Sequence, residues 1–337
     1  MKNRHLTIKD IARELNISPS TVSRALRNHH DISQATKDKV NEFAHAHNYQ
    51  PNALALSLRT SHTNIVGIII PQITHFFFAS VINGMEKVAE ENDYSIIICQ
   101  SHEDYEKEVR SVRTLMSTRV CGILASLAKT TQNYDHFQEV IDSDVPIVFF
   151  DRICTGLLTD RVVVDDYTGA FNAVDHLIRT GCKRIAFYSA PLHLEISKNR
   201  KNGYLDALRK NKIAVDESLI IICDTQEEAL ERTPHLLQKE NRPDAFFAIN
   251  DATASGILTA VKRNGLKVPD EISICGFSDG FVARNTDPKL TTVDQQGVEV
   301  GINAMELLLN RLRNNDENHR IASRIIKTKL LVRESTR

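Results

Sequence analysis

The chain has 337 residues, of which 42% are hydrophobic and 25% are charged, and its formal net charge is −1. Length and composition suit a folded protein of about two domains, and they exclude a single small domain and a disordered or fibrous chain. No apolar run approaches the roughly 18 residues that cross a bilayer, and the charged N-terminus contains no signal-peptide stretch. We therefore expect a cytoplasmic protein without a membrane segment.

The N-terminal segment is basic and contains no strand-like run. Residues 1–61 carry nine Lys or Arg and five Asp or Glu, a formal charge of +4, which suits a polyanionic partner. Thr7 and Asp10 predict a capping box at the start of a first helix, and Ser18-Pro19 is a favourable start for a second. A third helix is predicted from Ser33 onward. Three short helices with a tight turn at residues 16–18 predict a helix-turn-helix.

The second of these helices is expected to enter the DNA major groove, with its first residues at the base edges. Its apolar positions face inward and leave Ser20, Ser23 and Arg24 on the outward face. Arg24 can bond a guanine with two hydrogen bonds, which is worth about 1–3 kcal/mol of discrimination, and Ser20 can make a weaker contact. The alternative is a three-helix appendage that docks onto another molecule, but the basic charge and the placement of these residues favour DNA.

From residue 65 onward, continuous apolar runs alternate with amphipathic helical patterns. The predicted strands are 65–71, 95–100, 120–126, 145–151, 161–165, 184–190, 219–223, 245–250, 272–277 and 290–293. The predicted helices are 78–92, 105–118, 134–143, 167–180, 199–211, 227–240, 252–264 and 298–314. Such alternation predicts an α/β fold with doubly wound parallel sheets, and the length suits two lobes with a cleft between them.

Several motifs are more specific than these patterns. They are Thr7-Ile8-Lys9-Asp10-Ile11-Ala12, the run 17–26, Asn48-Tyr49-Gln50-Pro51-Asn52-Ala53, Ser57-Leu58, Asn250-Asp251, Val268-Pro269, Ile272-Ser273, Gly276-Phe277 and the run 290–295. Together they resemble the lactose/galactose-repressor (LacI/GalR) family of bacterial transcription regulators over nearly the whole chain. The resemblance implies a three-helix head followed by a two-lobed, periplasmic-binding-protein-like body.

The resemblance also implies which residues contact DNA. Pro19, Ser20 and Arg24 match the base-reading positions of the family, and Ser20 and Arg24 carry the direct readout because Pro19 has no side-chain donor. Leu58 matches the hinge leucine that the family inserts into the minor groove. The hydroxyl groups that look like phosphate contacts belong to Thr7, Ser18, Thr21 and Ser23, and the expected DNA-binding set also includes Asn28, Asn52 and Ala53.

We expect a DNA-binding domain at 1–50, a hinge helix and linker at 51–62, and an effector-binding and dimerisation domain at 63–334. The lobes of that domain are expected at about 63–164 plus 295–323, and at 165–294 plus 324–334. The expected partner is double-stranded DNA with a pseudo-palindromic operator, which two heads of a homodimer would bind. The expected function is a transcriptional regulator, in the family usually a repressor.

A small-molecule effector is expected at the carboxyl ends of the strands, where open α/β sheets bind ligands. Polar or aromatic residues follow three of the predicted strands, and these are Phe77, Phe78, Asp151, Arg152, Asn250 and Asp251. The resemblance adds Arg200, Ser278, Asp279 and Gln295. Each residue also has an ordinary interpretation as a helix cap or a core contact. A sugar or sugar derivative is the commonest effector of the family, and the resemblance implies that it acts by closing the cleft and moving the hinge helices.

Two other functions are compatible with parts of the chain. Residues 276–280 match the G-x-S-x-G elbow of hydrolases, with Ser278 as nucleophile, but Pro288 follows soon afterwards and the only later histidine is His319. A solute-binding protein of the same two-lobed fold would need an export signal and would not use the basic head.

Cofactors and metals are not predicted. The six cysteines lie far apart without a C-x-x-C pair, and the usual nucleotide-binding glycine motifs are missing from the sequence. His29-His30 and His45-x-His47 are possible metal ligands, but the sequence pattern shows no cysteine or acidic cluster that completes a site. We expect these histidines to be solvated or to lie near phosphates.

Overall fold

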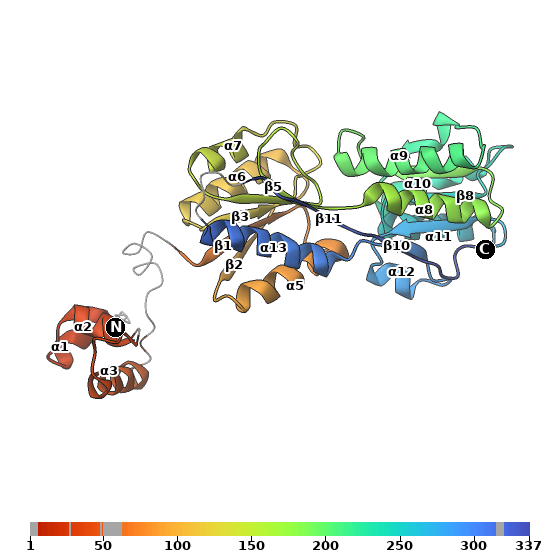
Figure 1. The fold of residues 1–337 in the computed structure, drawn as a ribbon. Helices are drawn as coiled ribbons and strands as arrows, with labels where there is room; N and C mark the ends of the chain where they lie inside the picture. The colour runs from red at the N-terminus through yellow and green to blue at the C-terminus, as the bar shows by residue number, and fades with distance from the viewer. Residues whose placement is uncertain (1–5, 27, 48, 50–62, 315–319) are drawn as a thin grey trace. The chain divides into compact units, whose positions relative to one another are not determined.

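The computed structural model describes residues 6–26, 28–47, 49, 63–314 and 320–337 (Figure 1). The chain divides into two compact units, Met1–Thr63 and Asn64–Arg337. The predicted hinge at 51–62, with Asn52, Ala53 and Leu58, lies outside the described residues, and so does His319. Among the described helices, none is both long and apolar enough to span a membrane.

Three helices form the described part of the first unit: α1 (Ile8–Glu14), α2 (Pro19–Leu26) and α3 (Gln34–Ala46). The predicted capping box is present, since the Thr7 hydroxyl accepts from the Asp10 N–H and the Asp10 carboxylate accepts from the Thr7 N–H. Asn16 adopts φ 55° at the turn before α2. The apolar faces of the three helices meet in a small core of Ile11, Ala12, Val22, Ala25 and Val40. The predicted helix-turn-helix is therefore confirmed.

The second unit contains two sheets. In the first sheet, the described strands run in the order β11 (Ser323–Ile326), β5 (Asp160–Val164), β4 (Ile147–Phe150), β3 (Gly122–Ala125), β1 (Ile65–Ile70) and β2 (Ser95–Gln100), and all neighbours are parallel.

Both faces of the first sheet are covered, because successive side chains of a strand point to opposite sides. Ile68 and Ile70 of β1 pack against α5 (Phe76–Glu90) and α13 (Gly297–Arg313). Ile69 packs on the other face with α6 (Tyr105–Ser117) and α7 (Asp135–Asp142). Two-sided burial explains why the strands appear in the sequence as continuous apolar runs.

The second sheet has the described order β12 (Lys329–Leu331), β10 (Thr291–Asp294), β9 (Ser273–Phe277), β8 (Ala245–Ala248), β6 (Ile185–Ser189) and β7 (Ile220–Ile222). Its strands are parallel except for β12, which is antiparallel to β10. One face is covered by α8 (Asp166–Arg179) and α9 (Glu195–Lys210), and the other by α10 (Gln226–Leu237) and α11 (Asp251–Arg263). The short helices η1 (Glu217–Leu219) and α12 (Phe281–Asn285) complete this half. The prediction of doubly wound parallel sheets is confirmed.

The chain passes between the two sheets after β5, after β10 and after β11 (Figure 1). The last passage differs from the expected lobe limit at 323, because β11 continues to Ile326 in the first sheet. Its residues pair in parallel with β5, from Ser323 opposite Arg161 to Ile326 opposite Val164. The division at 323/324 is therefore corrected to a point between β11 and β12.

Two glycines allow α5 and α13 to pack closely. A Cβ atom at Gly84 would overlap the carbonyl oxygen of Val298, and one at Gly301 would overlap the carbonyl oxygen of Val81. Only a residue without a side chain lets the two backbones approach this far. The pair of helices is thereby fixed as one rigid layer beneath the first sheet.

Candidate functional site

The start of α2 presents small polar side chains to solvent. The Ser18 hydroxyl accepts from the Thr21 N–H at 3.0 Å and lies 2.7 Å from the Ser20 hydroxyl. Pro19 and Ser20 are exposed, and the Arg24 side chain is 55% exposed. The three predicted base-contacting residues therefore lie on the accessible side of α2.

Ser23 does not share this face. It is only 4% exposed and lies between the core residues Val22 and Ala25. Because α2 packs against both α1 and α3, its buried face is wider than the apolar pattern alone suggests. The expectation that Ser23 faces outward is therefore wrong, although its proposed phosphate contact is not itself tested.

Asn28 follows α2, which ends at Leu26, and its backbone lies in the left-handed region with φ 56°. Asparagine tolerates this region better than most residues. Its N–H donates to the Ala25 carbonyl at 3.0 Å, and the following His29 N–H donates to the Arg24 carbonyl at 3.0 Å. The Asn28 residue is exposed. This turn directs the next three residues back toward the end of α2.

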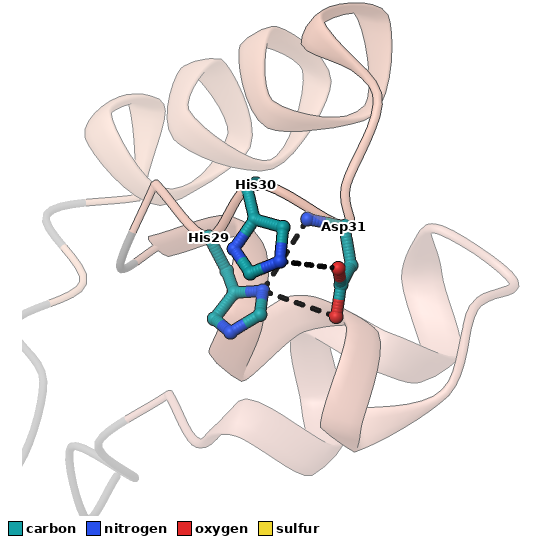
Figure 2. Close-up of side chains that lie close together, drawn as sticks. All are labelled: His29, His30 and Asp31. Atoms are coloured by element: carbon teal, nitrogen blue, oxygen red, sulfur yellow. Dashed lines mark hydrogen bonds and ion pairs between the residues drawn. The ribbon is translucent and has the colours of Figure 1, made fainter.

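Those three residues, His29, His30 and Asp31, form a compact cluster (Figure 2). Asp31 Oδ2 lies 3.3 Å from His29 Nδ1, and Asp31 Oδ1 lies 2.8 Å from His30 Nε2. The same carboxylate also lies 4.0 Å from Arg24 Nη1. The sequence interpretation missed this cluster, although the acidic residue that follows the histidine pair was the available signal.

In the second unit, Asp151 and Arg152 form the centre of a buried charged group. Asp151 is 5% exposed, and burial raises the pKa of its carboxyl to about 7 although Arg152 opposes the shift. Arg152 Nη1 donates to Glu103 Oε2 at 2.6 Å, and its guanidinium lies 5.8 Å from the centre of the Phe78 ring. Phe77 and Phe78 belong to α5 and are themselves buried in the core between this helix and the first sheet.

Arg200 lies in α9 and is 3% exposed. Its Nε and Nη2 atoms both lie 2.8 Å from Asp166 Oδ1, and its Nη1 donates to the Ile249 carbonyl at 2.5 Å. The guanidinium stacks 3.6 Å from the centre of the Phe277 ring. Burial raises the pKa of Asp166, and the nearby Arg200 acts in the opposite direction.

Several buried polar atoms of this unit have no hydrogen-bond partner among the described residues, and they include His75 Nδ1, Ser101 Oγ, Arg152 Nε and Ser197 Oγ. His75 precedes α5, Ser101 follows β2, and Ser197 lies one turn before Arg200. Burial and, to a smaller extent, the charge of Arg152 lower the pKa of His75 to about 4, so the imidazole is neutral at pH 7. Unsatisfied buried polar atoms are what a polar ligand would satisfy. His75 and Ser101 were not predicted from the sequence as candidate effector residues, although His75 lies in the segment after β1 and Ser101 directly follows β2.

The remaining predicted effector residues are held by partners within the chain. Asp251 accepts from the Gly280 N–H at 2.7 Å and the Thr292 hydroxyl at 2.6 Å, and burial raises its pKa to about 6. Ser278, with φ 121°, donates its hydroxyl proton to Gln295 Oε1 at 2.7 Å. These bonds fix the loop that follows β9.

Asp279 and Asn250 are also engaged. Asp279 accepts from Arg284 at 2.7 Å and from Arg333 at 2.5 Å. Asn250 caps α11, since its Oδ1 accepts from the Thr253 N–H at 2.8 Å. Contact of any of the predicted residues with an effector stays a prediction. Among them, Arg152 is the one with an unsatisfied buried atom.

Comparison with known proteins adds independent information. Residues 7–52 match the model of bacterial regulatory proteins of the lacI family, and residues 174–336 match a periplasmic binding protein-like domain. An HTH-type transcriptional repressor, PurR, of Vibrio atlanticus is 34% identical over 321 residues, which cover 94% of each chain. Catabolite control protein A of Priestia megaterium is 33% identical over 306 residues, covering 90% of this chain and 92% of the relative.

Solved structures agree with the fold. A lac repressor dimer bound to operator and an anti-inducer matches with a TM-score of 0.86 over 99% of both chains, at 21% identity. A periplasmic binding protein/LacI transcriptional regulator from Alkaliphilus metalliredigens, complexed with D-xylulofuranose, matches with a TM-score of 0.72 at 29% identity. That match covers 82% of this chain and all of the other.

The names of the PurR relative and of the Alkaliphilus metalliredigens protein describe them as a transcriptional repressor and a transcriptional regulator. The helix-turn-helix, the two-sheet body and the full-length relatives agree with one another. The chain therefore belongs to the lacI family of bacterial regulatory proteins and is a DNA-binding transcriptional regulator.

Proposed function

We propose that this regulator is a repressor that binds a pseudo-palindromic operator as a homodimer, and that a carbohydrate effector bound by its body controls operator affinity. The observation that carries the proposal is the combination of exposed Ser20 and Arg24 on α2 with unsatisfied buried polar atoms in the body. The first feature suits base contacts, and the second suits a polar small molecule.

For the operator, α2 would lie in the major groove with Ser20 and Arg24 at the base edges. The hydroxyl groups at the start of the helix, those of Ser18 and Thr21, would then lie close to phosphates. The division into a head at 1–50, a hinge at 51–62 and a body at 63–334 remains part of this proposal. Leu58 is the proposed minor-groove residue of the hinge.

A homodimer is supported by exposed apolar side chains in the body. Phe281 and Val282 of α12 are 70% and 38% exposed, and Ile98 and Ile222 lie on the edge strands β2 and β7. Phe281 and Val282 are neighbours in α12, so a second copy of the chain seated there would cover both side chains. Two-fold symmetry of the protein would match the two half-sites of a palindrome.

The charges of the effector region favour a neutral ligand. Arg152 is paired with Glu103 and Arg200 with Asp166, and His75 is uncharged at pH 7. An anionic effector would therefore meet arginines whose charge is already balanced. A polyol can instead hydrogen-bond to Arg152 Nε, which lies 4.0 Å from Asp151 Oδ2 without a hydrogen bond, and to the unsatisfied hydroxyls of Ser101 and Ser197. The complex of a 29% identical relative with D-xylulofuranose supports the same class.

Control of operator affinity would come from the arrangement of the two sheets. Asp151 and Arg152 follow a strand of the first sheet, whereas Arg200 belongs to a helix of the second. An effector held by both would favour one relative position of the lobes, and three chain passages allow that position to change. A coupling of about 1–3 kcal/mol between effector and operator would be enough for regulation.

The test is selection of bound fragments from sheared genomic DNA by the full-length protein at a stated salt concentration, followed by sequencing. We expect one enriched palindrome, and sugars linked to the adjacent genes should then change both operator affinity and melting temperature. Failure to enrich a palindrome, with or without added cell metabolites, would refute the operator proposal. Enrichment without any response to sugars would refute the effector proposal alone.

A further inference from the structure

We propose that His29, His30 and Asp31 bind a divalent transition-metal ion of the Zn²⁺ class beside the DNA-contacting helix α2. The proposal starts from the mutual positions of the three ligand atoms. His29 Nδ1, His30 Nε2 and an Asp31 carboxylate oxygen all lie within 4.8 Å of one another (Figure 2). Three side chains that donate nitrogen and oxygen ligands therefore converge on one point of the surface.

The separations suit a shared ion. Ligands at about 2.1 Å from a tetrahedral ion lie roughly 3.4 Å from each other. The two histidine–aspartate distances are 3.3 Å and 2.8 Å, so small side-chain rotations would admit the metal. The carboxylate lies beside the two stacked rings, and the Asp31 N–H also donates to His29 Nδ1 at 3.3 Å (Figure 2). A bound ion would replace these contacts to the ring nitrogens.

The loop is fixed on both sides, which reduces the ordering needed for binding. The His29 N–H donates to the Arg24 carbonyl at 3.0 Å, and the Ile32 N–H donates to the His29 carbonyl at 3.2 Å. Directly after the loop, the Ser33 side chain caps α3. The two imidazole rings stack with their centres 4.4 Å apart.

The ligand set also indicates the class of ion. Two imidazole nitrogens and one carboxylate suit Zn²⁺ and its neighbours Ni²⁺ and Cu²⁺ better than Mg²⁺ or Ca²⁺, which prefer oxygen ligands. The side chains of His29, His30 and Asp31 are 40%, 85% and 49% exposed, so an ion can reach them from solvent. Three protein ligands leave a fourth position open for water or another donor.

The site would also influence Arg24. The Asp31 carboxylate lies 4.0 Å from Arg24 Nη1 and attracts the guanidinium away from other acceptors. A bound ion would neutralise that carboxylate and add positive charge beside the DNA-contacting face. This coupling rests on the proposed function of Arg24, whereas the metal site itself does not.

Zn²⁺ binding to the full chain can be measured by competition with a colorimetric chelator. We expect one ion to be lost in a His29→Ala/His30→Ala variant and retained in a His45→Ala/His47→Ala control, which removes the other histidine pair of the head. Asp31→Asn should weaken binding by about tenfold or more. Equal binding by the two double variants, or no binding by the wild type, would overturn the site.

Two further measurements test whether the variant head still folds and whether metal binding changes operator affinity. The single variant His30→Ala changes a largely exposed side chain and should keep the melting curve of the head while losing the ion. Operator affinity of the wild type should rise about fivefold with Zn²⁺ and should not change in His30→Ala. An unchanged wild-type affinity with intact Zn²⁺ binding would refute the coupling alone, and absence of operator binding in every state would refute the proposed function instead.

Discussion

The most direct physical prediction concerns Asp151→Asn. Burial raises the pKa of Asp151 from an ordinary value near 3.8 to about 7. The folded state therefore binds the proton more tightly than the unfolded state, and the contribution of this carboxyl to stability falls as pH rises from about 4 to about 7. Above pH 7 the ionised group costs about 4 kcal/mol, at 1.36 kcal/mol for each unit of pKa. Asparagine cannot ionise and removes this cost.

The assay is guanidinium-induced unfolding of wild type and Asp151→Asn from pH 5 to pH 8. The free energy of unfolding of the variant, relative to wild type, should increase by about 3 kcal/mol over that range. Changes in hydrogen bonding by the amide shift all values equally, so the slope with pH is the informative quantity. Asp287→Asn, at a fully exposed side chain, is the control for the loss of one carboxylate. A variant difference that is constant with pH, or that shrinks as pH rises, would refute the reasoning.

Three further predictions address the head, the dimer and the first lobe. Arg24→Ala should weaken operator binding by about 1–3 kcal/mol and relax preference at one base pair, as measured by titration of single-base operator variants; unchanged preference would exclude Arg24 as a base contact. Phe281→Glu should raise the dimer dissociation constant about tenfold or more in sedimentation equilibrium, whereas Leu158→Glu, at another exposed apolar residue, should not; equal effects would exclude α12 from the interface. Gly84→Ala should destabilise the body by about 2 kcal/mol because α5 and α13 must separate, while Gly156→Ala, with only Cys154 Sγ nearby at 3.8 Å, should be neutral in chemical unfolding.

The strands that the sequence predicts well are those with a continuous apolar run. The run 65–71 exceeds the buried strand β1 by one residue, and the run 95–100 matches β2, which lies at a sheet edge but is apolar from Ile96 to Cys99. The strands β11 and β12 were not predicted, because they are short, begin with polar or charged residues and expose residues such as Ile325, which is 64% exposed. Such strands lack the continuous apolar pattern on which the prediction depended.

The same contrast applies to the candidate site. Exposure of Arg24 follows from helical periodicity, which is a local property. Burial of Ser23 depends on packing between α2 and two other helices, and the partners of Asp279 come from α12 and from Arg333 near the end of the chain. The sequence alone cannot show which polar atoms such distant segments satisfy. The cluster of His29 with Asp31 depends on a left-handed turn at Asn28, which the sequence pattern did not reveal.

The three chain passages between the sheets also determine the order in which the protein can assemble on the ribosome. The head is complete once residue 63 has emerged, and strands β6 to β10 of the second sheet are complete by residue 294. The first lobe waits for α13 and for β11 at residues 323–326. Until then, Val81 and Met85 of α5 lack their α13 partners, including Met305. A chain cut short before α13 would therefore expose the apolar face of α5, and we expect such fragments to aggregate more readily than the whole chain.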